Sequence, residues 1–465
     1  MCYRNHVKRK EKTSIKAEIS AKYPLSSRFR GPLCGTVCVP GDKSISHRAL
    51  IIGSLAVGNT KISGLLESED VMATVSALRK LGVNISRDTN NCWLVSGVGV
   101  GGFKEPSEII DLGNAGTAAR LLMGAISGCP ITAFLTGDSS LCSRPMARVT
   151  EPLMLMGAEM FPRSKNYLPL GIRGQIIPMP IEYDLKVPSA QVKSALLLCG
   201  LSSPGKVIIH ESIQSRDHTE RMLKQFGNDI TTELNSITGA SKITLTGQTE
   251  LVAANINVPG DFSSAAFLIA AALMIPDSEV TIKNVGVNRL RLGLLDTLLE
   301  MGAKISLFPK KNENAEPVAD ISVCYSKLSG ISVPADRSPL MIDEYPILAV
   351  IASVAKGKTE MRGLGELRLK ESDRISATTE LLRSSGVRVE EHEDGLTVHG
   401  SNNPIKGGAI IPTHLDHRIG MAAIVLGLSS KSGVTIDDIS PISTSFPGFV
   451  ELMQKLGADI YSAQE

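Results

Sequence analysis

The chain has 465 residues, 43% of them hydrophobic and 4% aromatic, with a formal net charge of +2 at pH 7. It exceeds the size of about 250–300 residues at which one hydrophobic core usually stops growing, so two domains are expected. The near-neutral charge argues against a general nucleic-acid binder, and the eight Cys, scattered without a CxxC pair, argue against zinc and indicate reduced thiols in a cytosol-like compartment.

Residues 1–30 differ from the rest of the chain because they are rich in Lys and Arg, poor in acidic residues and without an apolar run. They do not resemble a secretory signal, and we expect a basic, disordered leader. An organellar transit peptide and an upstream start codon are the alternatives. No run of 18 apolar residues occurs in the sequence, so no membrane span is expected.

The first chemically informative stretch, at residues 40–48, reads PGDKSISHR. A Pro-Gly turn, residues able to cap a helix and a following apolar run predict a helix that starts near Lys43. Lys43, Ser44 and Arg48 would then surround backbone N–H groups that already favour an anion, which predicts a phosphate or carboxylate site. A capped helix with ordinary surface charges is the alternative.

A short repeat organises the rest of the chain. An amphipathic segment, a Gly and a strand-like run recur six times, which predicts a helix that ends on a left-handed Gly and leads into a strand; the glycines are Gly82, Gly157, Gly227, Gly302, Gly386 and Gly457. Upstream of each lies another helix, apolar nearly all round and therefore expected to be buried, with a strand after it. The unit is strand–helix–strand–helix–strand.

Six units divide most simply into three plus three. We expect one domain from residues 31–42 and 260–465 and an inserted domain from residues 43–259, joined by strands at 39–43 and 257–261. If the first helices of both halves start at a shared cleft, several positive dipole ends converge there, and a polyanion is the ligand that suits them.

Polar and charged residues stand at these helix starts and form the candidate site. Besides the first cluster, they are Asn114, Gly116, Thr117, Arg144, Ser189, Gln191, Arg216, Asp343, Lys370, Glu371, Arg374, Asp416, His417 and Arg418. A solvated charge face is the alternative for LRLKESDR at 367–374. His414 and His417 lack a third ligand, so no metal site is expected, and Cys142 is expected to be a spectator thiol.

The ordered motifs PGDKSISHR, LGNAGTAAR, SRPMARV, SAQVKSALL, SRDHTE, PGDFSSAAF, MIDEYPILAV, LRLKESDR and LDHRIGMA resemble the 5-enolpyruvylshikimate-3-phosphate synthase family, from about Leu33 to Ile460. The sequences LDHRI at 415–419 and TSFP at 444–447 are similar to those of the class II branch of this family. The resemblance implies a two-domain inverted α/β barrel of six βαβαββ units, the enolpyruvyl transferase fold. It also implies an enzyme of the shikimate pathway, on the route to chorismate and aromatic amino acids, that transfers enolpyruvyl from phosphoenolpyruvate to the 5-hydroxyl of shikimate 3-phosphate and releases phosphate.

The resemblance also implies roles for individual residues. The shikimate 3-phosphate contacts would be Lys43, Ser44, Arg48, Ser189, Ala190, Gln191, Arg216, Asp343 and Lys370. The phosphoenolpyruvate contacts would be Lys43, Gly116, Arg144, Gln191, Arg374 and Arg418. Asp343 resembles the base for the 5-hydroxyl, and Glu371 resembles the acid that protonates the methylene carbon with help from Lys43. Addition and elimination through a tetrahedral intermediate require no cofactor or metal.

Two departures from the family pattern stand out. Thr444 occupies a position where many members carry a Lys near the phosphoenolpyruvate phosphate. Class II members that tolerate the inhibitor glyphosate can carry Ala where this chain has Gly116, so we expect Gly116 to leave room for that inhibitor.

The remaining expectations concern assembly and alternatives. We expect a cytoplasmic monomer that binds neither nucleic acid nor membrane and that is open without ligands and closes on them. A UDP-N-acetylglucosamine enolpyruvyl transferase is the nearest alternative. A non-catalytic anion-binding scaffold built from the same repeats is the alternative from another class.

Overall fold

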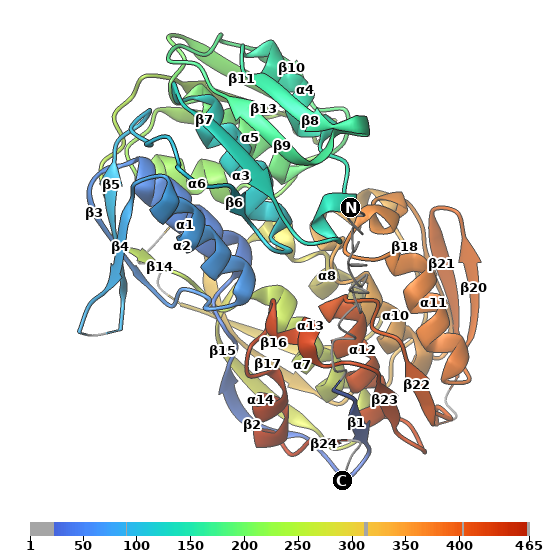
Figure 1. Ribbon diagram of the computed structural model, residues 1–465. Coiled ribbons are helices and arrows are strands. Elements are labelled where there is room, and N and C mark those ends of the chain that lie inside the picture. The colour runs from blue at the N-terminus through green and yellow to red at the C-terminus, as the bar shows by residue number, and fades with distance from the viewer. Residues whose placement is uncertain (1–22, 90, 311–314, 402–403, 463–465) are drawn as a thin grey trace, which may run out of the picture.

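The computed structural model describes residues 23–89, 91–310, 315–401 and 404–462, arranged in two lobes (Figure 1). Each lobe has its own core. One cluster of buried apolar side chains runs from Ile45 to Val258, and the other combines Leu25–Val39 with Phe262–Ile460.

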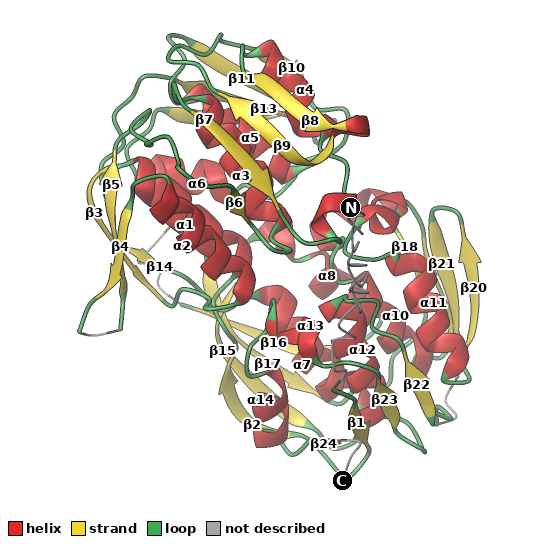
Figure 2. Ribbon diagram, in the orientation of Figure 1, coloured by secondary structure: helices red, strands yellow, loops and turns green. Residues whose placement is uncertain are grey.

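Six four-stranded sheets share one pattern, in which one edge strand is parallel to its neighbour and the other pairings are antiparallel. Their strand orders are β14-β3-β5-β4, β6-β7-β9-β8, β10-β11-β13-β12, β16-β17-β15-β2, β18-β19-β21-β20 and β22-β23-β1-β24. Figure 2 shows the sheets on the outside of each lobe and helices inside. The predicted six βαβαββ units and the inverted α/β barrel are confirmed.

The elements of the first three units lie between residues 43 and 246. In chain order they are α1 (Lys43–Leu55), β3 (Val57–Ser63), α2 (Glu69–Lys80), β4 (Asn84–Arg87), β5 (Trp93–Val98), β6 (Ile110–Asp111), α3 (Gly116–Ser127), β7 (Thr132–Thr136), η1 (Leu141–Ser143), α4 (Ala147–Leu155), β8 (Glu159–Arg163), η2 (Ser164–Asn166), β9 (Tyr167–Arg173), β10 (Glu182–Asp184), α5 (Ala190–Gly200), β11 (Lys206–Glu211), α6 (His218–Gln225), β12 (Ile230–Leu234) and β13 (Ser241–Thr246).

The other three units combine the N-terminal strands with the second half of the chain. Their elements are β1 (Leu25–Arg28), β2 (Cys34–Cys38), β14 (Ile256–Asn257), α7 (Phe262–Met274), β15 (Glu279–Gly286), η3 (Arg289–Arg291), α8 (Gly293–Glu300), β16 (Lys304–Pro309), β17 (Val318–Cys324), β18 (Ser332–Val333), η4 (Ala335–Arg337), α9 (Ser338–Met341), α10 (Tyr345–Val354), β19 (Gly357–Met361), η5 (Gly365–Leu369), α11 (Arg374–Ser384), β20 (Arg388–His392), β21 (Gly395–Gly400), β22 (Ala409–Ile411), α12 (His417–Leu428), β23 (Val434–Ile436), α13 (Ser440–Ser443), α14 (Phe449–Lys455) and β24 (Asp459–Ser462). Strand β14 is the exception in this set because it joins the first sheet.

The six repeat glycines adopt the predicted conformation. All have a positive φ, between 84° at Gly386 and 106° at Gly457, and each follows the second helix of its unit. A residue with a Cβ is strained in this region, which explains why Gly recurs there. The first helices are buried as predicted; in α7 every residue is buried.

The strand conformation predicted for the two connections is wrong. Residues 39–43 and 258–261 are not strands, because β2 ends at Cys38 and β14 ends at Asn257; an isolated bridge joins Gly41 to Gly260 between the two crossing segments. The chain does cross between the lobes at these positions, because β2 precedes α1 but pairs with β15, whereas β14 precedes α7 but pairs with β3.

Part of the predicted leader also has regular structure. Leu25–Arg28 form β1, which lies between β23 and β24 in the sixth sheet, so the predicted disorder does not extend through residue 30. The rest of that prediction, at residues 1–22, lies outside the described residues.

Candidate active site

A cavity of about 310 Å³ lies between the two lobes. All but two of the predicted site residues line it: Lys43, Ser44, Arg48, Gly116, Thr117, Arg144, Ser189, Ala190, Gln191, Arg216, Asp343, Lys370, Glu371, Arg374, His417 and Arg418. Asn114 lines an adjoining pocket, and Asp416 lies behind Arg374, whose Nε donates to it at 2.8 Å. The lining residues come from both halves of the chain and from the starts of α1, α3, α4, α5, α6, α10, α11 and α12 or the turns before them. The structure therefore brings the predicted residues together, and their individual roles remain predictions.

The start of α1 is fixed by its cap. Asp42 Oδ1 accepts a hydrogen bond from the backbone N–H of Ile45 at 2.8 Å, so α1 begins at Lys43. The Lys43 ammonium forms an ion pair with Asp70 on α2. This pairing keeps a cation at the wall of the cavity, close to the free N–H groups of the helix start.

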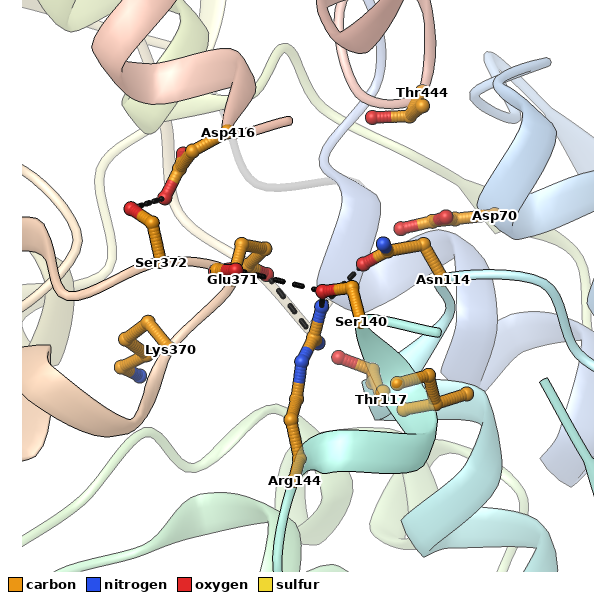
Figure 3. A network of polar contacts seen from close by, with 12 residues as sticks. Asp70, Asn114, Thr117, Ser140, Arg144, Lys370, Glu371, Ser372, Asp416 and Thr444 are labelled. Carbon is orange, nitrogen blue, oxygen red and sulfur yellow. Dashed lines mark hydrogen bonds and ion pairs between the residues drawn. The ribbon is translucent and has the colours of Figure 1, made fainter. Parts of the chain in front are cut away.

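Arg144 connects the two halves across the cleft (Figure 3). Its guanidinium donates to Asn114 Oδ1 and, at 3.0 Å, to Ser140 Oγ, and Nη1 lies 3.6 Å from Glu371 Oε1. Ser140 Oγ also donates to the backbone carbonyl of Glu371 at 3.4 Å. Only 6% of the Arg144 side chain is exposed, so its charge acts in a largely desolvated place.

Asp343 is surrounded by cations. Its carboxylate lies 2.6 Å from Arg216 Nη2, 3.3 Å from Arg374 Nη1 and 3.7 Å from Lys370 Nζ, and its carbonyl accepts from Arg418 Nη1 at 3.0 Å. Burial alone would raise the pKa of Asp343, but these four cations hold the pKa well below its ordinary value. Asp343 is therefore ionised and able to accept a proton.

Glu371 has a similar environment. Arg374 Nη2 lies 2.5 Å from Glu371 Oε2, and the same arginine donates through Nε to Asp416 Oδ2 at 2.8 Å. Burial alone would raise the pKa of Glu371, but Arg374 and Arg144 hold the pKa well below its ordinary value. An anionic ligand that engages these arginines would weaken this effect and make the carboxylate easier to protonate.

Several cavity residues were not predicted. Arg120 and Arg148 line the cavity, each four residues after a predicted one, and Asp70, Arg291 and Glu366 are further charged residues of its lining. Arg120 Nη1 donates to Gln191 Oε1 at 2.9 Å, and burial lowers the pKa of Arg120 to about 10, so it stays charged at neutral pH. The spacing of four from Gly116 was the signal that could have identified Arg120; Arg291 had no comparable signal.

Arg291 joins the two segments in which the chain passes between the lobes, residues 39–43 and 258–261. Its guanidinium lies 3.4 Å from Asp42 Oδ2 and 3.3 Å from Asp261 Oδ1, the carboxylates that cap α1 and α7, and donates to Ser263 Oγ at 2.7 Å. It therefore holds the starts of both helices next to each other at the back of the cleft.

Thr444 lies beside the main cavity and lines an adjoining pocket with Glu69, Asp70 and Asn114. Its hydroxyl donates to the Pro441 carbonyl at 2.7 Å. Arg120 and Arg148 line the main cavity and not the pocket of Thr444, so they add cations to the site without replacing the expected Lys at its position.

Within the described parts of the chain, no group of three or more His, Cys, Asp and Glu side chains is arranged to hold a metal ion. No helix of these parts is long and apolar enough to cross a membrane. The expectations of a metal-free and cofactor-free reaction stay predictions.

Comparison with solved structures identifies the class. EPSP synthase from Acinetobacter baumannii matches with a TM-score of 0.82 and 40% identity, over 95% of this chain and all of that chain. The enolpyruvyl transferase NikO from Streptomyces tendae matches with a TM-score of 0.75 at 16% identity, over 95% and 99% of the two chains, a likeness of fold alone. The two lobes of repeated units around a cationic cleft are thus the enolpyruvyl transferase fold.

Sequence comparison is more specific. The family EPSP synthase (3-phosphoshikimate 1-carboxyvinyltransferase) matches residues 28–453. Proteins named 3-phosphoshikimate 1-carboxyvinyltransferase from Rhodospirillum rubrum and Cereibacter sphaeroides are 55% identical over 441 residues and 52% identical over 437 residues, each covering 94% of this chain and 98% of the relative. The chain belongs to the EPSP synthase family. The UDP-N-acetylglucosamine enzyme and the non-catalytic scaffold are therefore disfavoured.

Proposed function

We propose that the interlobe cavity binds shikimate 3-phosphate and phosphoenolpyruvate side by side and that Asp343 and Glu371 carry the protons of the transfer. The activity follows from family membership: enolpyruvyl transfer from phosphoenolpyruvate to shikimate 3-phosphate. The observation that carries the assignment of roles is the placement of two carboxyl groups, Asp343 and Glu371, between cations from both halves of the chain in one cavity.

The two anions occupy different sides of the cavity in this proposal. Shikimate 3-phosphate contacts the starts of α1 and α5 and the cations around Asp343, through Lys43, Ser44, Arg48, Ser189, Ala190, Gln191, Arg216, Asp343 and Lys370. Phosphoenolpyruvate contacts Lys43, Gly116, Arg144, Gln191, Arg374 and Arg418. Guanidinium groups suit this task because they bind phosphate and carboxylate in pairs of hydrogen bonds.

The chemistry needs one base and one acid. Asp343 takes the proton of the 5-hydroxyl as its oxygen attacks the central carbon of phosphoenolpyruvate, and Glu371, protonated once the ligands engage Arg374 and Arg144, delivers a proton to the methylene carbon with Lys43 assisting. In the elimination the Glu371 carboxylate takes a proton back from the new methyl group as the bond from carbon to the phosphate oxygen breaks, which restores the double bond and releases phosphate. Binding of the substrate phosphate by Arg216 would withdraw a cation 2.6 Å from Asp343 and so raise the pKa of the base toward a useful range.

The direct test is phosphate release from phosphoenolpyruvate, first with shikimate 3-phosphate and then with UDP-N-acetylglucosamine as acceptor. Release with the first acceptor alone is expected. Release with only the second acceptor, or with neither, would overturn the proposal.

The organisation of the chain is part of the same proposal. We propose a cytoplasmic monomer with domains of residues 31–42 plus 260–465 and of 43–259, a division that the two clusters of buried apolar side chains support. Polar contacts bridge the halves in this structure, among them the ion pair of Arg148 with Glu366 at 2.7 Å and a hydrogen bond between His218 Nδ1 and Glu316 Oε1 at 2.7 Å. The two lobes can open in the absence of ligands only if these contacts separate. Small-angle scattering with and without both ligands measures the resulting change in compactness.

A further inference from the structure

Arg48 is held by two hydroxyl groups that the family resemblance does not assign to the site. Its Nε donates to Thr219 Oγ1 at 2.7 Å, and its Nη2 donates to Ser194 Oγ at 2.9 Å. A third bond runs from Nη1 to the Ser44 carbonyl at 3.0 Å. Arg48, Ser194 and Thr219 are all nearly inaccessible to solvent, at 3%, 1% and 1% exposed, so water cannot replace a lost partner easily.

The direction of these hydrogen bonds can be worked out from the number of protons. Ser194 has one hydroxyl proton and donates it to the Ala190 carbonyl at 2.5 Å. In its 2.6 Å contact with Thr219, Ser194 must therefore accept, so Thr219 donates its only proton there and offers its lone pairs to Arg48. The result is a directed chain from Arg48 through Thr219 and Ser194 to the start of α5.

This row of hydrogen bonds leaves part of the Arg48 guanidinium available to bind an anion. A guanidinium has five N–H groups, and three are used by Thr219, Ser194 and Ser44. The other two N–H groups make no hydrogen bond within the described parts of the chain, and Arg48 lines the cavity. Burial lowers the pKa of Arg48 only to about 10, so the group is charged at neutral pH.

We propose that Thr219 and Ser194 are positioning residues for shikimate 3-phosphate, which orient the Arg48 guanidinium so that its two free N–H groups meet the substrate's anionic groups. The inference rests on the proposed function, because it assumes that Arg48 binds this substrate. It predicts a selective effect, since Arg48 is not assigned to phosphoenolpyruvate.

A neighbouring ion pair makes the proposal testable without loss of the fold. Lys193 and Glu220 are the sequence neighbours of Ser194 and Thr219. They form an ion pair at 2.7 Å that joins α5 to α6 independently of the two hydroxyl groups. Thr219→Val keeps the shape and the β-branch but removes both hydrogen bonds, whereas Thr219→Ser keeps the hydroxyl. Thr60→Val is a matched control, because the Thr60 hydroxyl is buried in the same half and has no hydrogen-bond partner among the residues that the structure describes.

The experiment measures the Kd of shikimate 3-phosphate by titration calorimetry, together with kcat and both KM values. We expect Thr219→Val to raise the Kd and KM for shikimate 3-phosphate roughly tenfold, as for a lost hydrogen bond to a buried charged group, and to leave the KM for phosphoenolpyruvate within twofold. Thr219→Ser and Thr60→Val should stay near the wild type, and Ser194→Ala should resemble Thr219→Val.

Equal increases in both KM values, or a Thr219→Ser variant as impaired as Thr219→Val, would overturn the inference while leaving the proposed function intact. A wild-type protein that neither binds shikimate 3-phosphate nor releases phosphate with it would overturn the proposed function and this inference together.

Discussion

Replacement of Asp343 by Asn removes the proposed base while preserving its shape. The carboxylate has three cationic side chains within 3.7 Å, those of Arg216, Arg374 and Lys370. A positioned general base contributes roughly 10²–10⁴-fold to the rate, equivalent to about 2.7–5.4 kcal/mol of barrier. Removing one negative charge from among three cations does not weaken the attraction of the cavity for anions. We therefore expect kcat to fall by at least about 10²-fold while the KM for shikimate 3-phosphate rises less than about tenfold.

The assay is continuous measurement of phosphate release at saturating phosphoenolpyruvate with shikimate 3-phosphate varied. Asp336→Asn is the control, because Asp336 lies in the same segment and is exposed. A kcat of Asp343→Asn within tenfold of the wild type would rule out Asp343 as the base. A loss in kcat/KM that appears entirely in KM would make Asp343 a binding residue only.

Three further variants test other parts of the account. Lys43→Met should lower kcat/KM at least ~10²-fold, as expected for loss of a charge stabiliser in a desolvated site, and steady-state kinetics that show less than tenfold would contradict this. A Cβ at position 116 would lie 2.9 Å from Nη1 of both Arg120 and Arg144, so Gly116→Ala must displace the two guanidinium groups. We expect it to raise the inhibition constant of glyphosate far more than the KM for phosphoenolpyruvate; comparable increases would speak against a role of Gly116 in making room for the inhibitor. Burial and the nearby cations lower the pKa of His47 to about 3. The unfolded state therefore takes up a proton near pH 6.5 that the folded state refuses, and stability falls as pH drops from 6.5 toward 3. His47→Asn should remove up to about 2 kcal/mol of the loss in unfolding free energy between pH 7.5 and 5; urea denaturation that shows the same loss in both proteins would refute it.

The repeat was predictable because its signal is local. A helix that ends on a left-handed Gly leaves the same short pattern wherever it occurs, and the positive φ values of Gly82 and its five counterparts follow from that pattern. The site residues at the helix starts were found for the same reason. Asp42 and the residues after it carry a capping signal that requires no knowledge of the rest of the fold.

The long-range pairings were not predictable in the same way. Strand β14 has two residues, too few for a periodic pattern, and only the packed structure shows that it joins β3 in the first sheet. Arg291 reaches Asp42, 249 residues away in sequence, so no spacing rule connects them. The directed chain from Arg48 to Thr219 also joins distant segments, and each of its members alone reads as an ordinary buried polar residue.

The central claim is that both anions lie in the interlobe cavity with Asp343 and Glu371 between the cations of the two halves. A crystal structure of the enzyme with shikimate 3-phosphate and an unreactive analogue of phosphoenolpyruvate tests it most directly. The account predicts the sugar phosphate next to Ser44, Arg48 and Arg216 and the analogue on Arg144, Arg374 and Arg418. Density for either anion outside this cavity, or on residues of one half alone, would contradict it.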